Sequence, residues 1–275
     1  MRDVNTGSRG GEVIVPTAAG EQRPGGPAHL VFQPRLQPKH ARVYQTHLQR
    51  ERQKVLGLIG DLDDNRFTIL QSLTLLRQLA LDPALVDDQH EGIAASKTET
   101  LVEMLHEIAE EGHRALVFSQ FTGYLKRVRE RLSAAGLSTA YLDGSTTDRH
   151  QVIDGFRGGD ASVFLISLRA GGFGLNLTEA DYCFVLDPWW NPAAEQQAVD
   201  RAHRIGQTRP VMVYRLVASD TIEQKVMALK ERKSALFDAV LGGDSLSSTT
   251  FGADEIRELL GLEAPVRRPV GSLSG

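Results

Sequence analysis

The stretch from Asp200 to Gln207, D-R-A-H-R-I-G-Q, holds two arginines three residues apart, and Gln197 lies one helical turn before the first of them. Residues three and four apart share one face of a helix, so Gln197, Arg201 and Arg204 form one polar stripe if this stretch is helical. Guanidinium groups at this spacing can bind a nucleotide phosphate from two sides. The same pattern, taken in isolation, fits ordinary solvated arginines equally well.

Local signals indicate the helix that must carry this stripe. Asn191 is a good N-cap, Pro192 suits the first helical position, and Gly206 with Pro210 beyond it ends the run. A narrow apolar stripe runs beside the polar one and consists of Ala194, Ala198, Ala202 and Ile205. Because alanine side chains are small, the helix can lie close against a sheet, with its arginines at the rim of the contact.

Composition limits the class of protein. A chain of 275 residues with 41% hydrophobic content can bury one sizeable core and a smaller appended element. The net charge of -4 excludes a strongly basic nucleic-acid binder, so contact with nucleic acid must be local. Cys183 is the single cysteine, which excludes a disulfide framework and a cysteine metal cluster. With no apolar stretch near ~20 residues, we expect a cytoplasmic protein that is neither secreted nor embedded in a membrane.

The pattern along the chain divides into four parts. They are a disordered or artefactual N-terminus (1–27), a helical segment and linker (28–95), a main lobe (96–241) and a flexible tail with a short helix (242–275). Apolar residues at helical spacing predict two helices in the second part, separated near 60–65.

In the main lobe, short apolar runs alternate with helical patterns. Strands are predicted at 115–119, 139–142, 163–167, 182–186 and 211–216, and helices at 123–135, 148–156, 192–205 and 221–241. Alternation of this kind predicts an α/β fold, in which a parallel sheet carries helices on both faces. Ligands of such sheets bind beyond the carboxyl ends of the strands.

A glycine-rich loop follows the third predicted strand, with the sequence S-L-R-A-G-G-F-G-L-N-L. Gly171, Gly172 and Gly174 would let the backbone approach a phosphate, with Arg169 facing the anion. A simple tight turn is the alternative. The loop is not a Walker A motif, because no lysine follows a glycine anywhere in the sequence.

Three other loops start from the same edge of the predicted sheet. F-S-Q-F-T holds Ser119 and Gln120, D-G-S-T-T holds Ser145 and Thr146, and D-P-W-W-N-P holds Trp190. Hydroxyls and amides can position a phosphate backbone without reading its sequence, and an exposed tryptophan can press against it. The alternatives are a helix N-cap for Ser145 and Thr146, and core filling for the tryptophan.

Taken in order, these motifs and Q-Q-A-V-D-R-A-H-R-I-G-Q resemble the C-terminal RecA-like lobe of Swi/Snf-type DNA translocases of the second helicase superfamily, bacterial members included. The resemblance covers roughly 97–241 and implies a RecA-like, P-loop NTPase fold.

The resemblance also implies roles for single residues. Arg201 and Arg204 would be arginine fingers on the phosphates of ATP, with Gln197 nearby, and the glycine-rich segment with Arg169 would couple nucleotide to DNA. The residues implied to face the DNA backbone are Ser119, Gln120, Ser145, Thr146, Ser167 and Trp190.

The sequence departs from the family pattern in one respect. It has neither a Walker A loop nor a strand-borne D-E-x-H, and the pair Asp254-Glu255 in the tail cannot replace it. We therefore expect ATP and Mg²⁺ to be shared with a first RecA-like lobe supplied in cis or in trans, no metal to be bound by this chain itself, and the isolated chain to be inactive. Double-stranded DNA is the expected partner. The alternatives are an inert DNA-binding or partner-docking module, and one subunit of a split ATPase.

Overall fold

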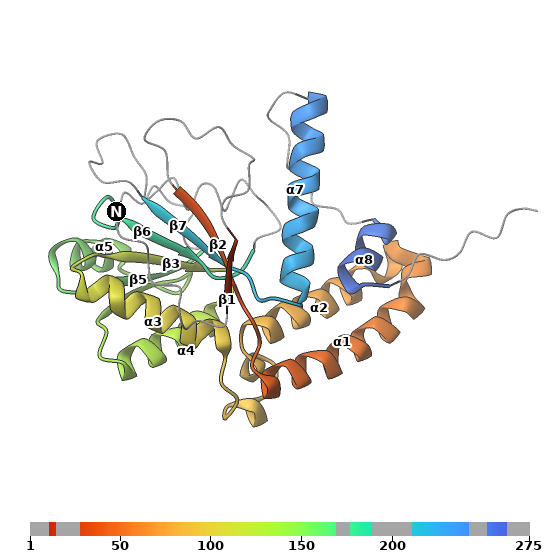
Figure 1. Cartoon of the computed structure of the whole chain (residues 1–275), viewed down its shortest axis with the longest axis horizontal. Coiled ribbons are helices and arrows are strands. Elements are labelled where there is room, and N and C mark those ends of the chain that lie inside the picture. Colours follow the sequence, from red (N-terminus) through yellow and green to blue (C-terminus); the bar gives the residue numbers. More distant parts are fainter. Residues whose placement is uncertain (1–10, 15–27, 169–176, 189–210, 242–251, 263–275) are drawn as a thin grey trace, which may run out of the picture.

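The structure, a computed structural model, describes residues 11–14, 28–168, 177–188, 211–241 and 252–262. Within these ranges one sheet has the strand order β1-β2-β7-β6-β3-β5-β4 (Figure 1). The strands are β1 (Gly11–Ile14), β2 (Ala28–Pro34), β3 (Ala115–Ser119), β4 (Thr139–Leu142), β5 (Val163–Ser167), β6 (Tyr182–Val185) and β7 (Met212–Leu216). All neighbouring pairs are parallel except β1 with β2.

The α-helices of the described ranges are α1 (Pro38–Leu58), α2 (Leu62–Leu81), α3 (Ser96–Glu110), α4 (Thr122–Ala134), α5 (Arg149–Gly158), α7 (Ile222–Leu241) and α8 (Ala253–Leu260). Short 3-10 turns connect them at η1 (Ile59–Asp61), η2 (Pro83–Leu85) and η3 (Asp88–His90). None of the helices in these ranges is both long and apolar enough to cross a membrane.

The central strands explain why the sheet needs cover on both sides. Every residue of β3 and β5 is buried, as expected for the centre of a parallel sheet. On one face Phe118 and Phe164 pack with Phe156 of α5. On the other face Val117 packs with Leu125 of α4 and residues of α3. The predicted α/β fold, a parallel sheet with helices on both faces, is confirmed.

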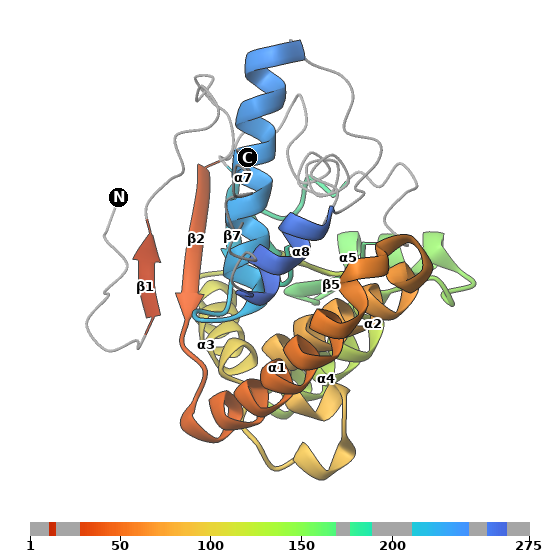
Figure 2. The same cartoon turned by 90° about the vertical axis from the view of Figure 1, so that its right-hand side faces the viewer.

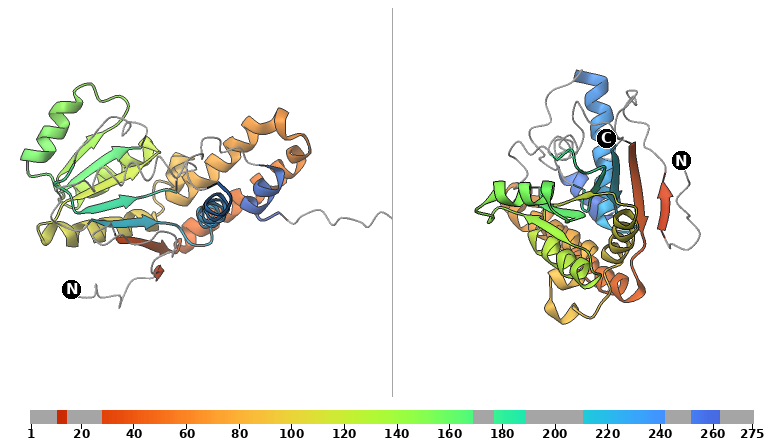
Figure 3. Two further views of the ribbon diagram at one scale, coloured as in Figure 1. Left: turned by 90° about the horizontal axis from the view of Figure 1, so that it is seen from above. Right: turned by 90° about the vertical axis from the view of Figure 1, so that its left-hand side faces the viewer.

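Helices α1, α2, α7 and α8 form a helical unit with a core of its own (Figure 2). Its fully buried side chains include Tyr44, Val55, Leu76, Leu79 and Leu260. The antiparallel hairpin of α1 and α2 matches the two predicted helices, and η1 lies where the break was expected. Figure 3 shows that this unit lies beyond one end of the sheet, on the side from which α7 leaves β7.

The structure contains two strands that the sequence pattern did not predict. β2 lies in the part predicted to be helical, and β1 lies in the part predicted to be disordered. The run Leu30-Val31-Phe32 pairs in parallel with the edge of β7, nearly two hundred residues away in sequence, so local periodicity could not reveal it.

The short helix of the tail is present, but it is docked and not free. Ile256, Leu259 and Leu260 of α8 are buried in the core of the helical unit. Arg52 of α1 donates from Nε to the Leu260 carbonyl at 2.5 Å, which neutralises part of the negative end of the helix dipole. A strongly amphipathic helix of only eight residues gains its stability from such packing, not from its own sequence.

Candidate functional site

The carboxyl ends of β3, β5 and β6 meet at one edge of the sheet. The register pairs Ser119 with Ser167, and the next residues continue the contact, because the Leu168 amide donates to the Ser119 carbonyl at 2.9 Å. The Leu186 amide donates to the Phe118 carbonyl, also at 2.9 Å. The loops that were predicted to carry the site therefore start side by side.

Asp187 is a shared hydrogen-bond acceptor at this edge of the sheet. Its side chain is fully buried and accepts hydrogen bonds from the Ser119 hydroxyl and, at 2.6 Å, from Nε2 of Gln120. The Ser119 Oγ also accepts from the Phe121 amide at 3.1 Å. Ser119 is itself fully buried, and these bonds let it hold the loop after β3 in place. Contact of Ser119 or Gln120 with DNA stays a prediction.

Ser167 differs from Ser119, its neighbour in the sheet. It is buried, and among the described residues its hydroxyl has no hydrogen-bond partner. An unsatisfied buried hydroxyl costs roughly 1–3 kcal/mol. Ser167 is thus the one predicted site residue in the described ranges whose buried hydroxyl has unused hydrogen-bonding capacity.

The loop after β4 is a rigid turn built on Asp143. Its Oδ1 accepts from the amide of Ser145 at 2.8 Å and from the hydroxyl of Ser145 at 2.6 Å, and the Asp143 amide donates to Oγ1 of Thr146 at 3.0 Å. The Ser145 hydroxyl is the main cause that lowers the pKa of Asp143, so the carboxylate stays charged. The N-cap interpretation of Ser145 and Thr146 is wrong, because Asp148 caps α5 by accepting from the Gln151 amide.

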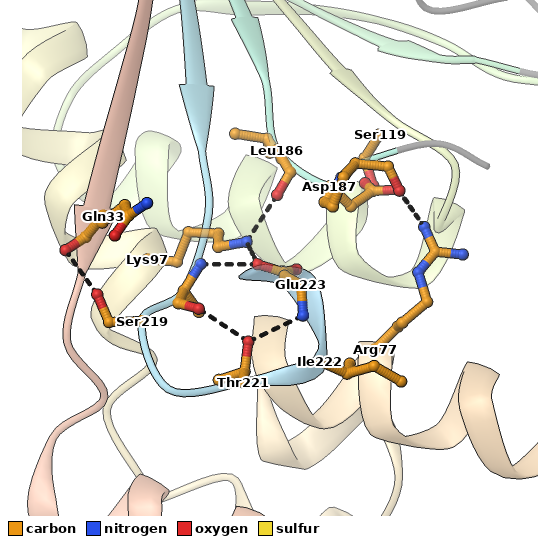
Figure 4. A network of polar contacts seen from close by, with 12 residues as sticks. Gln33, Arg77, Lys97, Ser119, Leu186, Asp187, Ser219, Thr221, Ile222 and Glu223 are labelled. Atoms are coloured by element: carbon orange, nitrogen blue, oxygen red, sulfur yellow. Dashed lines mark hydrogen bonds and ion pairs between the residues drawn. The ribbon is translucent and has the colours of Figure 1, made fainter. Parts of the chain in front are cut away.

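A buried ion pair lies beside this edge (Figure 4), and the sequence did not reveal it. Nζ of Lys97, at the start of α3, donates to Oε2 of Glu223 on α7 at 2.5 Å and to the Leu186 carbonyl at 2.8 Å. Both side chains are fully buried. Burial lowers the pKa of Lys97 and raises that of Glu223, and in each case the partner's charge opposes the shift.

Arg77 of α2 completes the cluster. Its Nη2 donates to the Pro188 carbonyl at 2.5 Å and lies 3.7 Å from Oδ2 of Asp187, and the guanidinium sits over the ring of Phe121. The signal for it was a charged residue inside the apolar run L-L-R-Q-L-A-L of a buried helix.

The remaining predicted site residues lie outside the described residues. They are Arg169, Gly171, Gly172, Gly174, Trp190, Gln197, Arg201 and Arg204. In the ranges that are described, no group of three or more histidine, cysteine, aspartate or glutamate side chains could hold a metal ion.

Comparison with known proteins identifies the domain. Residues 96–206 match the family model for the helicase conserved C-terminal domain, and a solved structure similar to the chain is the Sulfolobus solfataricus SWI2/SNF2 ATPase core domain. This chain carries the C-terminal helicase lobe of the Swi2/Snf2 family. The match begins at Ser96, the first residue of α3, and includes the sequence segment that holds Arg201 and Arg204.

Two relatives illustrate the sequence similarity of the Swi2/Snf2 lobe. The chain is 40% identical over 177 residues to the DNA repair protein RAD5 of Cryptococcus neoformans, covering 62% of this chain and 15% of that protein. It is 39% identical over 213 residues to the protein CHROMATIN REMODELING 19 of Arabidopsis thaliana, covering 75% of this chain and 26% of that protein. The chain thus spans a quarter or less of the length of most such relatives.

Two solved structures illustrate the structural similarity. The Sulfolobus solfataricus SWI2/SNF2 ATPase core in complex with dsDNA is 28% identical with a TM-score of 0.65, and the match covers 87% of this chain and 50% of that one. The C-terminal part of the Fun30 ATPase domain has a TM-score of 0.68 at 22% identity, which shows a shared fold, and covers 86% of this chain and 96% of that one.

Proposed function

We propose that this chain is the arginine-finger lobe of an ATP-dependent double-stranded-DNA translocase or remodeller. The observation that supports the proposal is the match of 96–206 to the helicase C-terminal domain, on a sheet whose strand ends bring the predicted loops to one edge. ATP, with its Mg²⁺, is the substrate. A similar SWI2/SNF2 ATPase core has been solved in complex with double-stranded DNA, which favours DNA as the second ligand.

In this proposal Arg201 and Arg204 bind the phosphates and stabilise the charge that develops during transfer, with Gln197 beside them. Arg169 and the glycines at 171, 172 and 174 carry the signal between nucleotide and DNA. Gln120, Ser145, Thr146, Ser167 and Trp190 contact the DNA backbone, while Ser119 holds the loop through Asp187.

The other wall of the nucleotide site comes from a first RecA-like lobe. This follows from the sequence, in which no lysine follows a glycine, so a Walker A loop must be supplied by another segment or another protein. A cytoplasmic, nucleoid-associated site of action fits such an assembly and belongs to the same proposal.

The test is a chimera in which this chain replaces the C-terminal lobe of a two-lobe Swi2/Snf2 ATPase core. We expect DNA-stimulated ATP hydrolysis by the chimera, and a fall in kcat of about 10³-fold or more for Arg201→Ala, the typical contribution of an arginine finger. Arg66→Ala is the matched control, since Arg66 makes only an exposed i,i+3 pair with Asp63 among the contacts described. ATP turnover by the isolated chain, or an active Arg201→Ala chimera, would refute the proposal.

A second candidate function is partner docking without catalysis. It is favoured by three exposed apolar side chains on the α1–α2 hairpin, of which Phe67 is 72% exposed, Leu56 59% and Leu70 40%. Exposed apolar groups gathered on one element often mark a protein interface. This candidate predicts DNA affinity that Arg204→Ala leaves unchanged, whereas the arginine-finger proposal predicts that the same variant loses ATPase activity in the chimera.

A further inference from the structure

The three residues that follow β6, 186–188, are held by side chains from three distant parts of the chain. Figure 4 shows Leu186 and Asp187 with the lysine and arginine that contact them. The Leu186 carbonyl accepts from Lys97 of α3 at 2.8 Å, and the Pro188 carbonyl accepts from Arg77 of α2 at 2.5 Å. Between them, the Asp187 carboxylate accepts from the loop after β3. We call this arrangement the 186–188 clamp.

The side chains of the 186–188 clamp are buried from solvent. Lys97 and Asp187 are 0% exposed and Arg77 is 2% exposed. Burying charged groups costs several kcal/mol for each ion unless partners compensate, and apolar side chains of similar size would often fill such a place as stably or better. Stability alone therefore does not account for a lysine and an arginine here. The charged groups instead fix the backbone in position, because each donor holds one backbone carbonyl in a defined place.

Arg77 differs from the other members of the clamp in the element that carries it. Its neighbours on α2, among them Leu73, Leu76 and Leu79, are buried in the core of the helical unit. Arg77 itself reaches out of that core to Asp187 and Pro188 at the sheet. A shift of α2 relative to the sheet would consequently pull on the backbone at Pro188, the residue directly before Trp189.

We propose that Arg77 is a positioning residue, which fixes the backbone of 186–188, from which the following segment starts, and ties this backbone to the orientation of the α1–α2 hairpin. That segment carries Trp190, Gln197, Arg201 and Arg204, so any effect on catalysis rests on the proposed function. The positioning itself does not, because the contacts that produce it lie within this chain.

The planar guanidinium matters for this role. Nη2 contacts both the Pro188 carbonyl and the Asp187 carboxylate, while Cζ lies 5.5 Å from the centre of the Phe121 ring. A lysine ammonium is a point charge that neither stacks on a ring nor forms a fixed fork. Arg77→Lys therefore keeps the charge and loses the geometry, and Arg77→Met loses both.

The chain provides its own probe, since its two tryptophans, Trp189 and Trp190, follow Pro188 directly. The experiment measures quenching of their fluorescence by acrylamide in the isolated wild-type chain and its variants. We expect the quenching constant to rise by about twofold for Arg77→Met, through local loosening, and by a smaller factor for Arg77→Lys. If Arg77→Met does not fold, Arg77→Lys carries the test.

Leu73→Ala is the matched control, because it creates a cavity in the core of the helical unit and removes none of the hydrogen bonds of the 186–188 clamp. It should lower the urea midpoint and leave the quenching constant as in the wild type. The proposal is overturned if the folded Arg77 variants quench like the wild type, or if Leu73→Ala raises quenching as much as they do. The measurement needs no nucleotide and no first lobe, so its outcome is independent of the ATPase result in the chimera.

Discussion

The two edges of the sheet use polar residues in different ways. At the amino edge, Arg114 donates to the carbonyls of Ala161 at 2.8 Å and Gly159 at 3.1 Å and lies over the Phe156 ring, and His113 pairs with Asp181. These contacts join loops and strands that are close neighbours in the sheet. Their role is to hold these neighbouring segments together, and we assign no ligand to this edge.

At the carboxyl edge, side chains from α2, α3 and α7 converge on the end of β6, and two buried oxygens in the described ranges, Oγ of Ser167 and Oε1 of Glu223, have no hydrogen-bond partner. An edge that only had to be closed would not need charged side chains from such distant parts of the chain. The difference indicates that the amino edge serves stability, whereas the carboxyl edge trades stability for the positioning of its loops.

The largest expected effect on stability comes from breaking the buried pair at the carboxyl edge. Lys97→Met leaves Glu223 buried without its counter-charge, so we expect the free energy of unfolding to fall by about 3–5 kcal/mol. Chemical denaturation measures it. The double variant Lys97→Met with Glu223→Leu should recover part of the loss, because neither charge is then stranded. A single variant as stable as the wild type would show that the pair is not charged in the folded state.

The next effect concerns the amino edge. Arg114→Ala removes several hydrogen bonds to carbonyls and the contact with Phe156, and we expect a loss of about 2 kcal/mol in the free energy of unfolding. In the two-lobe chimera the same variant should keep its kcat for ATP under conditions where it is folded. A fall in kcat beyond the unfolded fraction would contradict the division of labour between the two edges.

The two edges also differ in how far the sequence could predict them. The strands around Leu116 and Phe164 were predictable because a continuous apolar run between turn signals has few alternatives in an α/β chain. Ser119 and Ser167 could be placed at one edge because parallel strands end together. Their different environments could not, since Asp187 reaches Ser119 by a contact that no local pattern encodes.

The side chains around the 186–188 clamp were even harder to predict from local sequence patterns. Lys97 and Glu223 are 126 residues apart in sequence, and each looks like an ordinary polar residue in the first turn of its helix. Only the packing of α3 and α7 against the end of β6 brings them together. For Arg77 a signal did exist, because a charge in the buried stripe of a helix must find a partner. The identity of that partner, a backbone carbonyl after β6, depends on the tertiary fold.

The smallest effect we predict tests the turn at Asp143, the other rigid element of the carboxyl edge. The pKa of Asp143 is lowered in the folded state, chiefly by the Ser145 hydroxyl, so between that pKa and the unfolded value near ~3.9 the unfolded chain binds more protons. Its contribution to stability is therefore present above about pH 4 and is lost as the pH falls through the folded pKa. Asp143→Asn should cost under about 1 kcal/mol at pH 7 and less at an acidic pH below the folded pKa of Asp143, as measured by the difference between the urea midpoints of the two proteins. A difference that is the same at both pH values would mean that the Asp143 turn is held by shape and not by charge, which would make it resemble the amino edge more than the carboxyl edge to which it belongs.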